Sequence, residues 1–248
     1  MTLSPRLSIL FLLSLCNLAL AQSPELPAGL STDFNHESHE FSRAEIARIN
    51  AITARSSEAV RDLLPDLPDR IHVSIATIDR DLTAVGGVTG MADDPNTVLV
   101  FLSTTFDGGI VAAANTGLAA VLYHEFHHLA RGWTIKDNKF GPGITTAAVN
   151  EGLANVFAEI YTNTAFAGNA YPPQVREWWE EIGRLPVDAN YGSWMVQHPD
   201  GRQAIGYRAG SFVIRQILSR SDYSIIRLST MTVDEILILA EQALSTTP

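Results

Sequence analysis

The sequence Tyr123-His-Glu-Phe-His-His-Leu-Ala-Arg131 lies near the middle of a chain of 248 residues. It contains the pattern H-E-x-x-H as His124, Glu125 and His128. On a helix, residues four apart lie on one face, so both imidazoles can reach one cation while Glu125 projects beside it. The spacing therefore predicts a helix that carries a metal site of the kind found in zinc hydrolases.

The residues around the motif favour the same interpretation. A periodic apolar segment runs from about Thr116 to Arg131, and Gly132 follows it as a candidate C-cap. Four apolar side chains of this segment can face a core, namely Leu118, Val121, Leu122 and Leu129. The motif is therefore expected on a helix with one buried face.

A second predicted helix supplies further candidates for the site. Zinc enzymes commonly hold the ion with three protein ligands and keep a fourth position for water. Glu151 is the candidate third ligand. Asn155 lies one turn later on the same helical face, where it could hydrogen-bond the outward nitrogen of a ligating histidine. Gly152 has no side chain, which would let two helices approach closely around the metal.

Two β-prone runs precede the motif, and helical patterns dominate the chain after it. Residues 71–78 and 97–103 are rich in β-branched side chains and are expected to be strands. Gly86, Gly87 and Gly90 indicate turns between them. Helices are predicted at about 42–64, 116–131, 144–162, 173–182, 204–220 and 233–244. This order predicts an α+β fold, a small sheet followed by a mainly helical body.

Composition excludes several classes of protein. The chain has 17 Lys and Arg against 27 Asp and Glu, a formal net charge of −10. Nucleic acid is not expected as a partner, because proteins that bind it cluster basic residues against the phosphates. Cys16 is the only cysteine in the sequence, which excludes a disulfide framework and a multi-cysteine zinc module. Any metal must therefore be held by His, Asp and Glu.

The first 21 residues are predicted to be a secretory signal peptide. Arg6 provides a positive start, residues 7–18 form an apolar run, and Ala19-Leu20-Ala21 fits a cleavage site flanked by small residues. The apolar run is short for a membrane anchor, which needs roughly 20 residues. Cleavage near Ala21 would leave residues 22–248 as one domain, secreted or periplasmic, without a transmembrane segment.

Two strings resemble a known family. His124-Glu-Phe-His-His-Leu-Ala-Arg131 and Glu151-Gly-Leu-Ala154 are similar to the predicted zinc-dependent proteases grouped as domain of unknown function 2268. Gly206-Tyr-Arg-Ala-Gly210 matches a G-Y-x-x-G segment that this group tends to carry. An H-E-x-x-H motif followed at a distance by a helix-borne Glu also resembles the gluzincin metallopeptidases. The resemblance covers about residues 103–218 and implies a zincin-like fold with the motif helix at the active site.

The resemblance also implies roles for the site residues. One zinc ion held by His124, His128 and Glu151 would polarise a water molecule and the substrate carbonyl. Glu125 would accept the proton of the water and pass it to the leaving amine. Tyr207 would donate a hydrogen bond to the oxyanion of the tetrahedral intermediate.

Several side chains have two open interpretations. Tyr207 could instead pack in a helix with its hydroxyl at the surface, and His198 is an alternative oxyanion donor. His127 is expected at the surface or behind the ligands rather than among them. Arg131 could pair with a carboxylate near the site or favour the helix C-terminus. Residues 97–103 occupy the place of the gluzincin edge strand that pairs with substrate, with an interior strand as the alternative.

The predicted function is that of a secreted zinc hydrolase, most simply a peptidase acting on peptides or proteins. One alternative is a zinc amidase that acts on a non-peptide or cell-wall substrate. Another is a binding domain without activity, in which the motif is fortuitous. Zinc content of the purified protein would separate this last alternative from the two enzymes.

Overall fold

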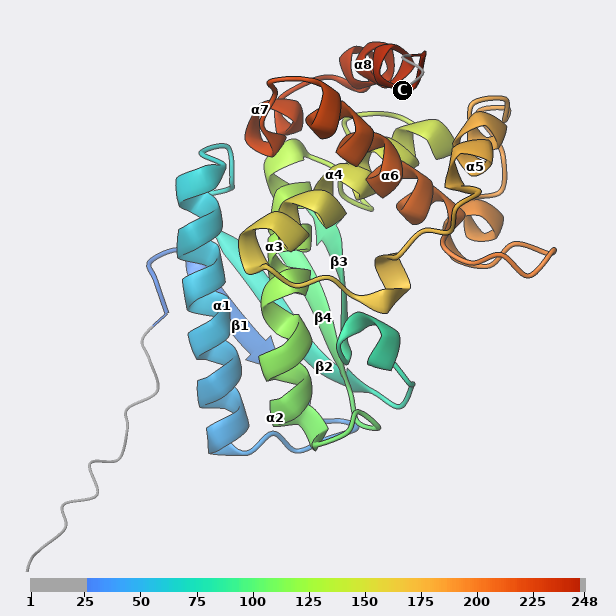
Figure 1. The fold of residues 1–248 in the computed structure, drawn as a ribbon. Helices are drawn as coiled ribbons and strands as arrows, with labels where there is room; N and C mark the ends of the chain where they lie inside the picture. The colour runs from blue at the N-terminus through green and yellow to red at the C-terminus, as the bar shows by residue number, and fades with distance from the viewer. Residues whose placement is uncertain (1–25, 246–248) are drawn as a thin grey trace, which may run out of the picture.

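The structure is a computed structural model that describes residues 26–245. Most of the sheet lies in the first half of the chain, and helices fill the second half (Figure 1). The strands are β1 (Leu30–Phe34), β2 (Ile71–Ile78), β3 (Val88–Asp94) and β4 (Thr97–Ser103). The predicted fold class, a small sheet followed by a mainly helical body, is confirmed.

The helices agree closely with their predicted ranges. They are α1 (Arg43–Leu63), α2 (Gly109–Ala113), α3 (Ala119–Arg131), α4 (Ile144–Thr162), α5 (Val175–Ile182), α6 (Ile205–Arg220), α7 (Ile225–Ser229) and α8 (Val233–Ser245). The motif helix begins earlier than predicted, because a π-helical turn at residues 114–118 joins α2 to α3 in continuous helical backbone. Helices α2 and α7 were not predicted.

The sheet is mixed, with the strand order β1-β2-β4-β3. Strands β1, β2 and β4 are parallel, and β3 returns antiparallel along the outside of β4. Of the two interpretations of residues 97–103, the interior strand is therefore the correct one: β4 is interior, and β3 is an edge strand. The chain can reverse before β3 because Gly86 and Gly87 adopt positive φ angles of 77° and 81°.

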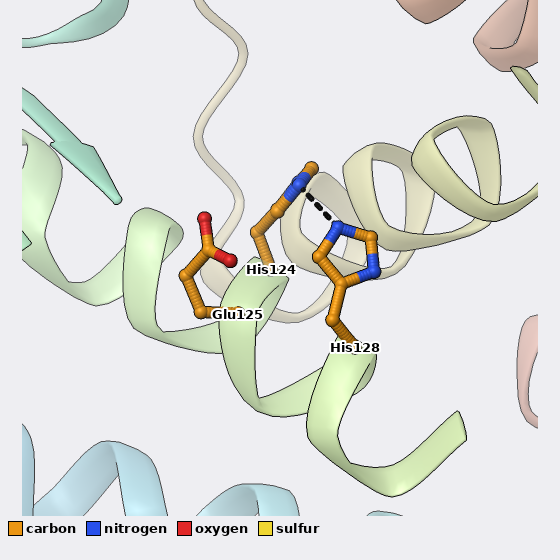
Figure 2. Close-up of side chains that lie close together, drawn as sticks. All are labelled: His124, Glu125 and His128. Atoms are coloured by element: carbon orange, nitrogen blue, oxygen red, sulfur yellow. Dashed lines mark hydrogen bonds between the residues drawn. The ribbon is translucent and has the colours of Figure 1, made fainter. Parts of the chain in front are cut away.

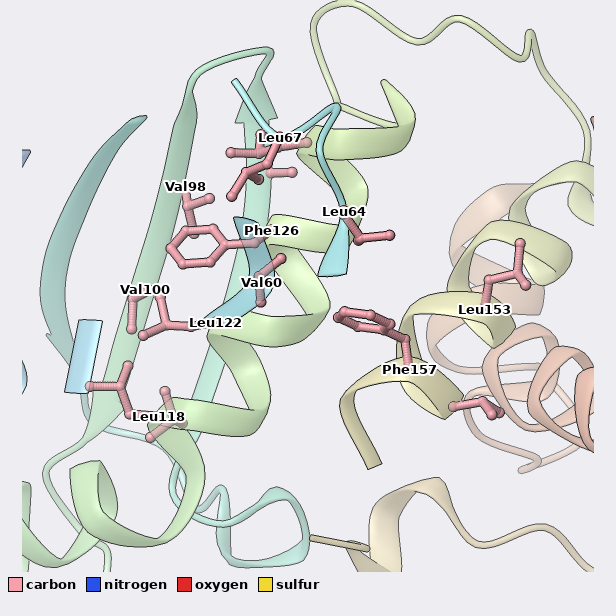
Figure 3. Packing of buried hydrophobic residues seen from close by; sticks show 14 of the residues in the cluster. Val60, Leu64, Leu67, Val98, Val100, Leu118, Leu122, Phe126, Leu153 and Phe157 are labelled. Carbon is pink, nitrogen blue, oxygen red and sulfur yellow. The ribbon is translucent and has the colours of Figure 1, made fainter. Parts of the chain in front are cut away.

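One face of the sheet packs against α1 and α3, which lie side by side (Figure 1). Every second residue of β2 is buried, as expected for a strand with one covered face. In Figure 3, Leu122 and Phe126 of α3 point toward Val98 and Val100 of β4, and all four side chains are fully buried. Burying a side chain of this size contributes about 1.5–3 kcal/mol, so this layer fixes α3 on the sheet.

The helical body is held by a close crossing of α4 and α6. A Cβ atom on Gly152 would lie 2.3 Å from the backbone carbonyl carbon of Gly210. A Cβ atom on Gly210 would lie 1.8 Å from the carbonyl oxygen of Ala148. Neither position has room for a side chain, so the close approach predicted from Gly152 is observed, with α6 as the partner of α4.

No helix in residues 26–245 combines the length and the hydrophobicity that crossing a membrane requires. The predicted signal peptide, at residues 1–21, lies outside the described residues.

Candidate metal centre

Helix α3 brings the motif histidines together at the wall of a cavity. The Nε2 atoms of His124 and His128 are 2.9 Å apart. Figure 2 shows the two rings turned toward each other, with Glu125 beside them on the same helix. Ligand atoms of these three residues all lie within 4.8 Å of one another. The i, i+4 spacing therefore produces the shared face that the sequence predicted.

Glu151 comes from α4 and meets both imidazoles. Its Oε2 atom is 3.1 Å from Nε2 of His124 and 3.1 Å from Nε2 of His128. Its other oxygen, Oε1, accepts a 2.9 Å hydrogen bond from the indole N–H of Trp133. The carboxylate is thus held at both oxygens, and Oε2 faces the two histidines.

These three residues suit a zinc ion. Two imidazole nitrogens and one carboxylate oxygen are a donor set that zinc takes in hydrolases. Ligands bonded at about 2.0–2.2 Å to a tetrahedral ion lie roughly 3.3–3.6 Å from each other. The three separations of 2.9 to 3.1 Å in the structure are slightly shorter, so a small outward movement of the side chains accommodates the ion.

The two carboxylates of the site have opposite electrostatic character. Burial would raise the pKa of Glu151, but the charge of His128 and hydrogen bonds from both histidines outweigh burial and lower it. Burial raises the pKa of Glu125, and the nearby His124 and His128 oppose that change without cancelling it. Glu151 is therefore the ionised partner of the histidines, whereas Glu125 can hold a proton more readily.

Glu125 also contacts the edge strand. The backbone N–H of Ala92 on β3 lies near its carboxylate and favours the ionised form. A Cβ atom on Gly90 would lie 2.8 Å from Val121 and 2.9 Å from Cγ of Glu125. Gly90 was predicted as a turn, but it lies inside β3. The absence of a side chain there lets strand and helix meet beside the catalytic candidate.

The two histidines have different support behind them. Asn155 lies near the His124 ring and favours its protonated form, raising its pKa, and its amide nitrogen donates to Ser211 Oγ at 3.2 Å. A direct hydrogen bond from Asn155 to a ligating histidine stays a prediction. The Nδ1 atom of His128 is buried and has no hydrogen-bond partner among the described residues. Orientation of His128 therefore depends on packing and on Glu151.

Tyr207 of α6 reaches the same cavity. Its hydroxyl pairs with that of Tyr191, and the charge of Glu151 together with burial raises the pKa of Tyr207 well above its ordinary value. The phenol therefore stays protonated and able to donate. His198, the alternative donor, stacks on Trp194 with ring centroids 4.8 Å apart and bonds Asp200 at 2.8 Å. The structure brings Tyr207 to the site and turns His198 toward these partners.

Two adjoining cavities meet at His124 and Glu125. The larger has a volume of about 690 Å³ and the smaller about 250 Å³. Both are lined by Gly90, His124, Glu125 and Tyr207. The candidate site therefore lies at the middle of a long depression rather than at the bottom of one pocket.

The adjoining face of α3 carries His127 and Arg131, at i+3 and i+7 from His124. His127 was expected at the surface or behind the ligands, but it is fully buried, and its Nε2 lies 2.9 Å from Ser229 Oγ in α7. Within residues 26–245 Arg131 pairs with no carboxylate: it donates to Asn150 Oδ1 at 3.0 Å and to the carbonyl oxygens of Ser229 and Met231. Through their hydrogen bonds to Ser229, both residues hold α7 against the motif helix.

The sequence analysis missed three contributors to the site. Trp133 lies in an irregular segment and Tyr191 at the start of a π-helical turn (residues 192–196), and their partners are distant in the sequence. Gly90 carried a visible signal, a glycine between β-prone residues, which is typical of close backbone approach as well as of a turn.

Comparison with known proteins agrees with this geometry. Residues 71–238 match the family model described as Predicted Zn-dependent protease (DUF2268). No curated protein matches the sequence. The matched range spans strands β2 to β4 and extends into α8, including every candidate ligand. The chain therefore belongs to the DUF2268 family of predicted Zn-dependent proteases.

Proposed function

We propose that this chain is a secreted zinc-dependent peptidase that uses one zinc ion. The observation that carries the proposal is the convergence of two Nε2 atoms and one carboxylate oxygen within 3.1 Å, beside a second, buried carboxylate. Family membership supports zinc and a protein substrate. Secretion rests on the sequence of the first 21 residues alone.

His124, His128 and Glu151 would hold the ion. Bound there, zinc would supply Lewis-acid chemistry, polarising a water molecule and the substrate carbonyl. Trp133 keeps Glu151 in place through the bond to Oε1. Such a bond to a ligating carboxylate fixes its orientation and strengthens metal retention.

Glu125 is the proposed general base and acid. It is buried at the junction of the two cavities, and its raised pKa suits a group that takes a proton from water and then releases it. The nearby Ala92 N–H favours the ionised form of the carboxylate and so opposes the effect of burial. Proton transfer to the leaving amine then completes cleavage of the peptide bond.

Tyr207 is the proposed donor to the oxyanion. It lines both cavities and remains protonated, so its hydroxyl can donate where negative charge develops. Its present partner is the Tyr191 hydroxyl. Exchange of that partner for the substrate oxygen would let the hydrogen bond form during the reaction.

Strand β3 is the proposed binding edge for an extended peptide. Residues 88–90 line the smaller cavity and residues 90–92 the larger, so the strand runs past the site along both. An exposed strand edge recognises the main chain of a peptide. This role replaces the one predicted for residues 97–103.

The deciding experiment compares two isosteric substitutions. Glu125→Gln should keep zinc and lose turnover by a factor of about 10²–10⁴, because only proton transfer is removed. Glu151→Gln should lose zinc, because it removes a charged ligand. Atomic emission measures the zinc content, and cleavage of a peptide library with and without chelator measures turnover. Glu58→Gln, on the exposed face of α1, is the control for both assays. Equal zinc loss in the first two variants would contradict the division of roles.

A further inference from the structure

Exposed apolar side chains gather beside the candidate site. Ten large apolar side chains are exposed in residues 26–245, and four of them line the larger of the two cavities, namely Met91, Ile135, Val187 and Tyr191. Single exposed apolar residues are ordinary, but a group of them around a cavity is typical of a surface that binds a ligand or partner. The larger cavity is therefore a candidate binding surface in its own right.

Two segments that connect helices form most of the cavity wall outside the metal centre. Residues 133–143 follow α3, and residues 187–191 lie between α5 and α6. A Cβ atom on Gly143 would lie 3.8 Å from Cγ2 of Val187, which is ordinary van der Waals contact. The two segments therefore meet and form one continuous surface.

Backbone hydrogen bonds hold the exposed apolar side chains in place. Ile135 and Val187 are both 64% exposed. The N–H of Ile135 donates to the carbonyl of Ala92 at 3.0 Å, and the N–H of Ala189 donates to the carbonyl of Pro186 at 3.1 Å. The apolar surface is thus already formed, so a ligand can cover it without first ordering the two segments.

This wall carries little charge. Outside the metal centre, Asp188 is the only Asp, Glu, Lys or Arg among the described residues that line the larger cavity. The wall therefore favours apolar groups, and the carboxylate of Asp188 disfavours acidic ones.

The larger cavity has room for more than one side chain. Its volume is about 690 Å³. A closed apolar cavity of about 150 Å³ already holds a benzene molecule, and sites that bind a whole small molecule have volumes of about 300–1,000 Å³. One side chain beside the cleaved bond would leave much of the apolar wall in contact with water, whereas several neighbouring apolar side chains would cover it.

We propose that the larger cavity binds a run of consecutive apolar residues of the substrate, with Ile135 and Val187 as the residues that determine this specificity. The inference rests on the proposed function. His124, His128 and Glu151 belong to the wall of the same cavity, so a chain bound there leads directly into the metal centre. The preferred substrate is an apolar segment of a peptide or of an unfolded protein, because folded proteins bury such segments.

The first test uses peptides that share one cleaved bond. They carry one, two or three consecutive leucines next to that bond, with serine elsewhere, in one series before the bond and in another after it. In the series whose leucines enter the larger cavity, kcat/KM should rise by about tenfold with the second leucine and further with the third, because each transfers apolar surface from water to the cavity. Glutamate in place of the second leucine should abolish the gain.

Substitutions at exposed positions test the wall itself. Val187→Asp and Ile135→Asp place a carboxylate on the apolar surface and should reduce the gain from the second leucine to below about twofold. The matched controls are Val196→Asp and Ile238→Asp, whose side chains are 63% and 56% exposed and do not line the cavity. These controls should keep the tenfold gain. Zinc content and Tm check the fold of each variant.

Binding without turnover separates this inference from the proposed function. Calorimetry on the zinc-loaded Glu125→Gln variant gives the dissociation constants of the same peptides, which should fall by about tenfold with the second leucine. If the zinc-loaded wild type cleaves no peptide, the proposed function fails, and the dissociation constants still decide whether the cavity binds an apolar segment.

Two results would overturn the inference. Changes below about twofold beyond the first leucine, in both series and in both kcat/KM and affinity, would show that the cavity takes a single side chain at most. The same gain in Val187→Asp as in Val196→Asp would show that the apolar residues of the substrate bind elsewhere.

Discussion

The two faces of α3 carry similar residues at the same spacing and do different things. On the cavity face, His124 and His128 are four residues apart and share the Oε2 atom of Glu151. On the adjoining face, His127 and Arg131 are also four residues apart and share Ser229. Spacing brings each pair together, but the neighbouring helix decides the chemistry. Helix α4 offers a carboxylate, and α7 offers a hydroxyl and carbonyl groups.

The protonation of the two faces differs accordingly. Burial and the charge of Arg131 hold the pKa of His127 well below its ordinary value, so this ring is neutral near pH 7. The Ser229 hydroxyl donates to the Ile225 carbonyl at 2.8 Å, so it must accept from His127, which identifies Nε2 as the protonated nitrogen. A ring whose Nε2 carries hydrogen cannot bind metal there. The contrast predicts that substitutions on one face change catalysis and metal binding, while those on the other change stability.

The largest effect on the α7 face is expected from Arg131→Met. Burial lowers the pKa of Arg131 to about 10, so it remains charged near neutral pH. Methionine leaves the buried acceptors on Asn150, Ser229 and Met231 without this donor. The free energy of unfolding should fall by about 3 kcal/mol or more, since each unsatisfied buried group costs about 1–3 kcal/mol.

Urea unfolding measures this loss. The matched control is Arg227→Met at an exposed position, whose free energy of unfolding should lie within about 0.5 kcal/mol of the wild-type value. Zinc content and kcat per folded molecule should stay unchanged. A variant as stable as the wild type but deficient in zinc would contradict the claim that the α7 face affects stability and the cavity face affects zinc binding.

On the cavity face, Tyr207→Phe should do the reverse. The fold and the zinc should remain, while kcat falls by roughly ten- to a thousandfold, the cost of one oxyanion donor. KM should change little, because the hydrogen bond strengthens mainly in the transition state. Steady-state kinetics of Tyr223→Phe, an exposed tyrosine, provide the control. An unchanged kcat would reject the role, and a loss of stability typical of a buried core residue would assign Tyr207 to packing.

A smaller effect is expected from Trp133→Phe. Phenylalanine keeps an aromatic ring but loses the indole N–H that bonds Glu151 Oε1. Zinc affinity should fall by about tenfold, the lower end of the range for a partner that orients a metal ligand. Competition with a fluorescent chelator measures the affinity. Unchanged affinity would show that His124 and His128 alone set the position of the Glu151 carboxylate.

Much of the architecture was predictable because local patterns determine it. The H-E-x-x-H spacing predicted one face of α3, and the β-branched runs predicted β2 and β4. Strand β3 was missed because its sequence, Val-Thr-Gly-Met-Ala-Asp-Asp, mixes a glycine and two aspartates into a short run. Its place at the edge comes from a turn at Gly86 and Gly87, so chain order alone could not decide whether residues 97–103 were an edge or an interior strand.

The roles that sequence could not predict depend on partners far away in the chain. His127 meets Ser229 across 102 positions, and Trp133 meets Glu151 from an irregular loop. Within the motif, His127 and His128 are adjacent and chemically identical. Only the helices packed on either side of α3 distinguish the buried structural histidine from the candidate ligand.

The smallest effect is expected from Ser229→Ala, which isolates one contact of the α7 face. The substitution removes the hydroxyl that accepts from His127 but leaves the backbone carbonyl that Arg131 uses. The free energy of unfolding should therefore fall by only about 1 kcal/mol, the net value of one hydrogen bond. The control is Ser219→Ala, which removes an exposed hydroxyl bonded to Gln216. Its free energy of unfolding should lie within about 0.5 kcal/mol of the wild-type value. Zinc affinity should match the wild type, because the cavity face keeps all its contacts. A tenfold loss of zinc affinity in Ser229→Ala would show instead that α7 positions the ligands through His127, and the two faces of α3 would then act as one unit.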